Sequence, residues 1–224
     1  MKPMPKQTET VLSALATLDC DREALLITLK TVIGGDGAPM FPLDLLASGA
    51  VKRAVSAISA MKLLVDSWNM VSARLLLRTH IDTALRFSAP WLVHNPHEFA
   101  TLVISGQAIN KLKDREGQRL TDARLVIIRS GDYPWLPNVY DNLCDYVHFS
   151  ASHLAAATTS VEDDGSLSLL ISETDFDFPE SSWLEVIDCF QETSAILLKF
   201  LHGYSTTKRL TQEELEEGRK RAST

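Results

Sequence analysis

Two long stretches of the sequence repeat apolar residues at the three- and four-residue spacing of an α-helix. The first runs from Thr8 to about Val32 and stops at a run of glycines. The second opens at Pro42, whose fixed φ suits a first helical turn, and continues to about Ser88 with a break expected near Gly49. Stretches of this length are too long for ordinary strands, so the sequence predicts a mostly α protein, a helical bundle.

Capping signals predict further helices in the rest of the chain. Each expected start carries a side chain that can accept hydrogen bonds from the first turn, or a proline that fits that turn. The expected starts are Asn95, Thr121 or Asp122, Pro137, Ser182 and Thr211, and the expected ends include Gly106, Ile128 and Gly203. The helix opened by Pro137 is expected to cover residues 138–154.

In one segment the apolar residues repeat with a different period. Residues 166–178 alternate apolar and polar side chains, which predicts a small β insertion of one or two short strands. No internal repeat and no clear linker divide the chain. We therefore expect a single helical domain over residues 1–205, followed by a charged C-terminal tail over residues 206–224.

The composition indicates a cytoplasmic protein that buries a core. Of its 224 residues, 45% are hydrophobic, yet charged residues interrupt every long apolar run. The N-terminus lacks the apolar stretch of a signal peptide, and the three cysteines show no disulfide spacing. The sequence therefore predicts no membrane partner.

The charges are distributed very unevenly. Residues 1–129 carry 16 Lys and Arg against 12 Asp and Glu, and residues 199–224 carry six against four. Residues 130–198 carry 13 acidic residues and no Lys or Arg. This acidic third is a poor surface for a phosphate backbone. It either lies against the basic part of the same chain or of a second copy, or forms a solvated acidic face.

The segment CDYVHFSASH, residues 144–153, gathers side chains that can do chemistry. On one continuous helix, Tyr146, Ser150 and His153 share a face. Tyr140, Cys144 and His148 share another. A hydroxyl close to an imidazole is suited to acid–base or nucleophilic chemistry, because histidine titrates near neutral pH. The alternative is that these groups satisfy one another's hydrogen bonds in a helix–helix contact.

A charged stripe crosses the most apolar helical region at four-residue steps. It consists of Arg74, Arg78, Asp82 and Arg86, and its flanks are rich in leucine. The helix expected over residues 138–154 offers partners in its aspartates, Tyr146 and His148, so we expect the two helices to pack with these polar stripes facing. The contact is either an ion-pair network that fixes helix register or an anion pocket lined by the arginines.

Signatures of cofactor and metal sites are lacking. The sequence contains no P-loop, no Gly-x-Gly-x-x-Gly after a strand, no Gly-x-Ser-x-Gly and no His-Glu-x-x-His. Cys144 and His148 have the spacing of two zinc ligands but lack a second pair. The basic segment 111–129 has no interleaved aromatic residues for stacking on nucleotides. We therefore predict no metal and no cofactor.

The charged stripe in RTHIDTALRF, residues 78–87, and the later helix with VYDNLCDYVHFS, residues 139–150, resemble HEPN-like helical bundles of bacterial and phage-associated proteins. The resemblance covers roughly residues 65–155. It implies a homodimer and a role in antiphage or toxin–antitoxin systems. Some members of that group are metal-independent ribonucleases that use an Arg followed a few residues later by a His; the nearest such spacing here is Arg74 to His80.

These observations favour a binding or regulatory protein with a polar interhelical pocket. The pocket residues are expected to be Arg78, Asp82, Arg86, Tyr146, His148 and His153. One alternative is a metal-independent ribonuclease or nucleotide-processing enzyme with RNA or a nucleotide as ligand. In that case the catalytic residues would be His148, His153 and Tyr146, and Arg78 or Arg86 would stabilise phosphate. A second alternative is a purely structural or interaction protein.

Overall fold

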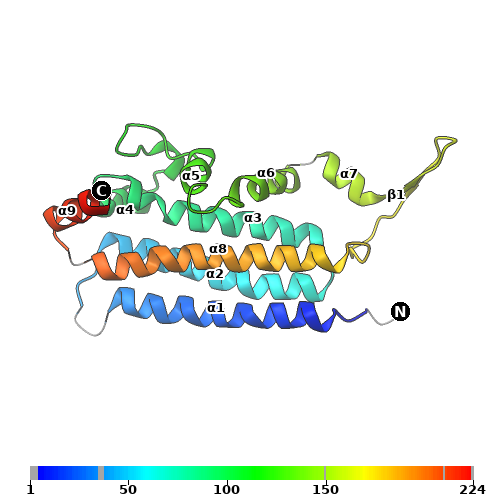
Figure 1. Cartoon of the computed structure of the whole chain (residues 1–224), viewed down its shortest axis with the longest axis horizontal. Helices are drawn as coiled ribbons and strands as arrows, with labels where there is room; N and C mark the ends of the chain where they lie inside the picture. The colour runs from blue at the N-terminus through cyan, green and yellow to red at the C-terminus, as the bar shows by residue number, and fades with distance from the viewer. Residues whose placement is uncertain (1–4, 35–37, 149, 209, 223–224) are drawn as a thin grey trace.

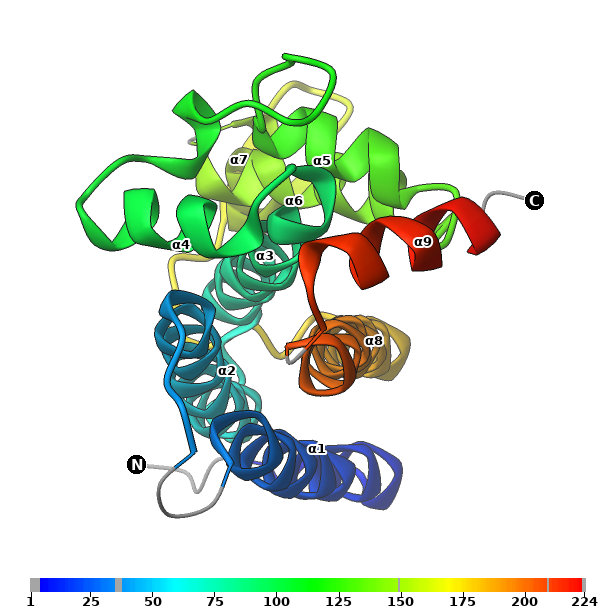
Figure 2. The same cartoon turned by 90° about the vertical axis from the view of Figure 1, so that its left-hand side faces the viewer.

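Four long helices pack side by side around a common core in the computed structural model (Figure 1). They are α1 (Glu9–Ile33), α2 (Pro42–Asp66), α3 (Met70–Phe87) and α8 (Glu180–Thr207). Seen from one end, they form a ring in the order α1, α2, α3, α8 (Figure 2). The structure describes residues 5–34, 38–148, 150–208 and 210–222. The prediction of a mostly α helical bundle is confirmed.

Smaller elements cover the outer side of α3. They are α4 (Pro96–Ile104), α5 (Asp122–Arg129), α6 (Leu136–Val147), α7 (Ala151–Ala157) and two short 3-10 turns, Ala89–Leu92 and Ile109–Lys111. The last helix, α9 (Gln212–Ala222), follows α8 at the far end of the bundle. No helix among the described residues combines the length and the apolar composition needed to cross a bilayer.

Local capping explains where several helices begin. The side chains of Thr8, Asn69, Asn95 and Thr121 accept hydrogen bonds from the first turns of α1, α3, α4 and α5. Before α9, the backbone N–H of Thr211 donates to Glu214, and the N–H of Glu214 donates to the Thr211 hydroxyl. The starts expected at Thr8, Asn95, Thr121 and Thr211 are thus confirmed.

The break between the second and third long helices lies 18 residues after the expected position at Gly49. Gly49 sits inside α2, whose buried stripe of Ala47, Val51 and Ala54 continues past it. One glycine costs a helix only about 1 kcal/mol, which this packing outweighs. The chain turns instead after Ser67, where Trp68 adopts a φ of 56°.

The helix expected over residues 138–154 is two helices. α6 ends at Val147, His148 has an extended backbone, and α7 starts at Ala151. In the turn, the Ser150 hydroxyl donates to the Asp145 carbonyl at 2.8 Å, so a side chain replaces a helical hydrogen bond. The face predicted for Tyr146, Ser150 and His153 is therefore divided between α6 and α7, whereas Tyr140 and Cys144 of the other face both lie in α6.

The β insertion begins earlier than predicted. Strands β1 (Thr158–Val161) and β2 (Leu167–Leu169) form an antiparallel hairpin that projects from the bundle (Figure 1). Residues 170–178 contain no strand and return to the bundle as bends and turns. There, Phe176 contacts the Trp68 ring at 5.2 Å between centroids, and Asp175 accepts from the backbone N–H of Met70. Phe176 and Phe178 of this segment therefore lie beside Trp68 and Arg74, whereas Ile171 is exposed.

α8 is longer at both ends than the sequence indicated. It begins at Glu180 rather than after Ser182, and it passes through Gly203 to Thr207. Gly203 lies beside the indole of Trp91, 3.8 Å from where a Cβ would stand. The buried stripe of α8 runs from Trp183 to Tyr204, and its packing holds the helix beyond the glycine.

Candidate functional site

Helix α3 packs against α2, α5, α6 and α8, so it carries the polar side chains that connect the bundle with the outer helices. The predicted stripe of Arg74, Arg78, Asp82 and Arg86 does face these outer helices. It does not converge on one pocket. Each arginine meets a different partner, and the stripe divides into three local contacts.

The first contact is a buried cluster around Arg78. Its guanidinium forms an ion pair with Asp82, although Nη1 and the Asp82 carboxylate are not aligned as a regular hydrogen bond. The same group donates to the Tyr140 hydroxyl and lies 3.6 Å from the centre of the Tyr140 ring. Burial raises the pKa of the Asp82 carboxyl, and Arg78 opposes this shift in part. The cluster joins α3 to α6 and is balanced in charge.

The second contact links α3 to α5. Arg86 donates from Nε and Nη2 to the two carboxylate oxygens of Asp122, at 2.9 and 2.8 Å. This bidentate geometry is the strongest that an arginine forms with a carboxylate, and it raises the pKa of Arg86 further. Its charge is therefore already compensated within the chain.

The third contact brings together two of the three candidate catalytic residues. Arg74 donates to the Tyr146 hydroxyl and lies over the rings of Tyr146 and Phe178, at 4.7 and 4.9 Å. The ring of His153 lies 5.8 Å from that of Tyr146, and its Nδ1 accepts from the Ser150 backbone N–H at 3.3 Å. His148 is exposed at the end of α6. The break before α7 thus separates His148 from this group.

An open groove of about 260 Å³ lies where α3, α6 and α8 meet. Its inner part is apolar, with the buried side chains of Leu77, Leu143 and Val186, and the exposed carboxylates of Asp145 and Glu185 stand beside them. We call it the acidic groove. Its lining comprises Arg74, Leu77, Val139, Asn142, Leu143, Asp145, Tyr146, Glu185, Val186 and Cys189.

The acidic groove has a negative electrostatic field. Burial raises the pKa of the Cys189 thiol to about 11, and the carboxylates of Glu185, Asp188 and Glu192 add to the effect. A thiol with this pKa stays protonated near neutral pH, so it is not an effective nucleophile there. Cys189 acts in the groove as a small apolar side chain.

A second groove lies on another face of the bundle, between α2, α3 and α4, with a volume of about 400 Å³. We call it the α2–α4 groove. Most of its lining is apolar, and it includes Leu46, Ala50, Phe87 and Val103. Asp82 and Arg86 reach it from the α3 stripe, and Arg53 reaches it from α2.

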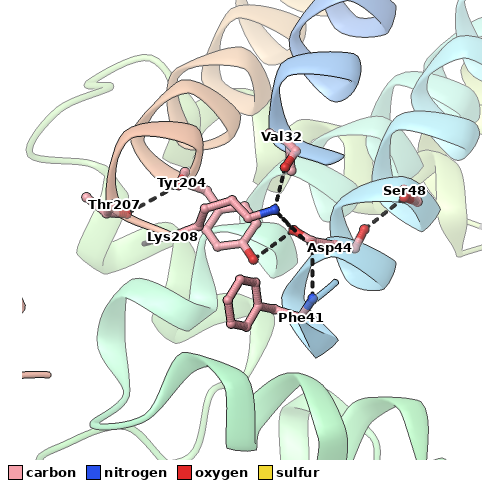
Figure 3. A network of polar contacts seen from close by, with 7 residues as sticks. All are labelled: Val32, Phe41, Asp44, Ser48, Tyr204, Thr207 and Lys208. Carbon is pink, nitrogen blue, oxygen red and sulfur yellow. Dashed lines mark hydrogen bonds and ion pairs between the residues drawn. The ribbon is translucent and has the colours of Figure 1, made fainter. Parts of the chain in front are cut away.

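A buried polar network that was not predicted lies at the end of the bundle (Figure 3). Lys208 donates to both carboxylate oxygens of Asp44 at 3.1 Å and to the Val32 carbonyl at 2.6 Å, and the Tyr204 hydroxyl donates to Asp44 at 2.9 Å. The side chains of Lys208 and Asp44 are 5% and 0% exposed. Lys208 therefore packs into the bundle, although the sequence placed it in the charged tail.

His80 is also buried within the bundle rather than at a site. Its Nε2 lies 2.9 Å from the Ser194 hydroxyl, and its ring stacks on Phe190 at 4.1 Å. Burial and the charge of Arg53 lower the pKa of His80 to about 3. It is neutral near pH 7 and separated from Arg74, so this Arg–His pair forms no joint site.

Comparison of the chain with protein-family models, curated proteins and solved structures finds no match. The resemblance to HEPN-like bundles, and the homodimer and RNA or nucleotide ligand that it implies, stay predictions. Among the residues that the structure describes, no group of three or more His, Cys, Asp or Glu side chains is placed to hold a metal ion.

Proposed function

We propose that the protein is a binding module that holds a basic, apolar-faced segment of a partner protein in the acidic groove. The observation that carries this proposal is the combination of a buried apolar lining with exposed carboxylates on both bordering helices. Asp145 belongs to α6 and Glu185 to α8, so the two carboxylates stand on different walls.

The surroundings of the groove extend its negative charge. Asp141 on α6 and Asp188 and Glu192 on α8 are exposed. Residues 130–198, which supply α6, α7, the hairpin and the first two thirds of α8, contain no Lys or Arg. A basic partner would meet no repulsion from these elements, and its approach would be accelerated by their field.

The apolar lining supplies the other half of the recognition. Leu77, Leu143 and Val186 come from three different helices and are only 2–5% exposed, so they form a fixed surface in the depth of the groove. Because so little of this surface faces water, covering it adds only a small gain, at roughly 25 cal/mol for each Å² removed from water. Charge would therefore select the partner, and apolar contact would add to its affinity.

Arg74 and Tyr146 fix the end of the groove near α7. The Arg74 guanidinium is held between the rings of Tyr146 and Phe178 and donates to the Tyr146 hydroxyl. In this position Arg74 connects α3 with Tyr146 of α6. Of the three catalytic candidates, Tyr146 therefore lines the proposed binding groove.

The test uses two synthetic amphipathic peptides of about 14 residues, with Leu on one face and either Lys or Glu on the other. Isothermal titration calorimetry should show saturable binding of the Leu/Lys peptide, weaker at high salt, and no binding of the Leu/Glu peptide. The substitution Glu185→Lys should lower the affinity for the Leu/Lys peptide about tenfold, because it reverses a charge beside the apolar lining.

A matched control is Glu213→Lys, which makes the same charge change on the exposed surface of α9. It should leave the affinity within about twofold of the wild type. Equal binding of both peptides, or an affinity that Glu185→Lys does not change, would show that the acidic groove is not the site.

A further inference from the structure

The α2–α4 groove has properties of a small-molecule site that is separate from the acidic groove. Its volume of about 400 Å³ falls within the range of about 300–1,000 Å³ that such sites occupy. Leu46, Ala50, Phe87 and Val103 give it an apolar wall, and the exposed side chains of Leu45 and Ile104 extend this wall outward. A ligand for this surface needs an apolar body.

The charges that reach the groove leave one cation uncompensated. Arg86 is bound by both oxygens of Asp122, and Asp82 is paired with Arg78. Arg53 is exposed, and within the described part of the chain no ion pair or hydrogen bond engages its guanidinium. A carboxylate placed there would therefore gain a new ion pair without breaking an existing one.

The position of Gly49 also favours a binding site in the α2–α4 groove. It lies inside α2 and lines the groove, and a Cβ added to it would meet no atom within 4 Å. Its φ is not in the left-handed region, so neither backbone conformation nor packing within the chain requires glycine there. Glycine inside a helix is less favourable for folding than alanine. The missing side chain keeps the groove open beside Leu45 and Arg53.

From these observations we propose that the α2–α4 groove binds an amphipathic monocarboxylate, with its alkyl chain along the apolar wall and its carboxylate on Arg53. Leu45 and Arg53 are eight residues apart on α2, which corresponds to about 12 Å along the helix axis. This distance suits an alkyl chain of medium length. Arg53 is the one cation in this lining that has no anionic partner within the described part of the chain, so the proposed ligand carries one negative charge.

The test titrates the full chain with decanoate below its micelle concentration, using calorimetry, and compares it with decanol. Decanoate should bind saturably at one site, and decanol should bind at least about tenfold more weakly because it offers no charge to Arg53. Arg53→Glu should lower the affinity for decanoate by at least about tenfold. The matched control Lys52→Glu changes the adjacent exposed residue, which does not line the groove, and should keep the wild-type affinity.

Gly49→Leu provides a variant that blocks the groove without weakening the fold. Leucine favours helix over glycine, so the thermal midpoint should equal or exceed that of the wild type while decanoate binding is lost. Absence of saturable decanoate binding by the wild type would overturn the proposal. So would equal binding of decanol, unchanged binding by Arg53→Glu or Gly49→Leu, or binding of an acidic amphipathic peptide in place of decanoate.

Discussion

The end of the bundle around Asp44 and the acidic groove around Glu185 both contain carboxylates, but they differ in how those carboxylates are satisfied. Asp44 is fully buried, and Lys208, Tyr204 and the Phe41 backbone N–H all donate to it. Glu185 is exposed beside an apolar lining. A buried carboxylate whose partners all come from the chain holds helices together, whereas an exposed one beside apolar side chains is available to another molecule.

The largest effect should come from breaking the closed network. Asp44→Ala leaves the Lys208 ammonium buried without a counter-charge, so the free energy of unfolding should fall by about 3–5 kcal/mol. Glu185→Ala should change it by about 0.5 kcal/mol or less. Urea denaturation of both variants measures the difference.

A double variant separates the effect of an unpaired buried charge on stability from the effect of lost packing. Asp44→Ala combined with Lys208→Met leaves no unpaired charge, so it should be more stable than Asp44→Ala alone. If Asp44→Ala proved as stable as Glu185→Ala, the distinction between the closed network and the open groove would fail.

An intermediate effect should appear in the pH dependence of stability, through His80. The unfolded chain takes up a proton near pH 6.5, but the folded chain does so only near pH 3, because burial lowers the pKa of this imidazole. Stability present above pH 6.5 should therefore be lost as the pH falls, by roughly 1.4 kcal/mol per pH unit and by about 2 kcal/mol at pH 5.

Chemical denaturation from pH 7 to pH 4.5 tests this expectation. His80→Gln should flatten the slope, because the glutamine side chain does not titrate. His148→Gln, on an exposed histidine, should keep the wild-type slope. Equal slopes for wild type and His80→Gln would mean that other groups control the acid response.

The smallest expected change in stability comes from replacing two glycines, and its sign differs between them. Gly49→Ala should stabilise the protein by about 0.5–1 kcal/mol, because it sits inside α2 with open space around it. Gly34→Ala should destabilise it, since Gly34 has a φ of 84° and a Cβ there would lie 2.8 Å from that of Ala38. Thermal unfolding of the two variants measures both signs, and a stabilised Gly34→Ala would contradict the argument.

The sequence was sufficient to predict the bundle, since helix formation depends on local patterns. The repeats before and after Pro42 and the caps at Thr8, Asn95 and Thr121 are all written within a few residues. The breaks were harder to place because tertiary contacts decide them. Packing carries α2 past Gly49, whereas a side-chain hydrogen bond from Ser150 helps to end the helix before α7.

The polar contacts were only partly predictable for the same reason. The sequence placed Arg78 and Asp82 on one face correctly, but it did not name Tyr140, to which Arg78 donates, among the partners of the stripe. Lys208 and Asp44 are separated by 164 residues, so no local pattern links them. The one available signal was Asp44 itself, an acid among the leucines of the first turns of α2.

The contact between Lys208 and the first two helices also limits the order in which the fold can form. α1 packs along α8, and the Lys208 ammonium reaches the Val32 carbonyl across 176 residues of chain. During synthesis, α1 and α2 must therefore wait with part of their apolar surface uncovered until α8 has been made. The bundle closes only when α8 packs against α1, and a nascent chain that stops before Lys208 would leave Asp44 without its counter-ion.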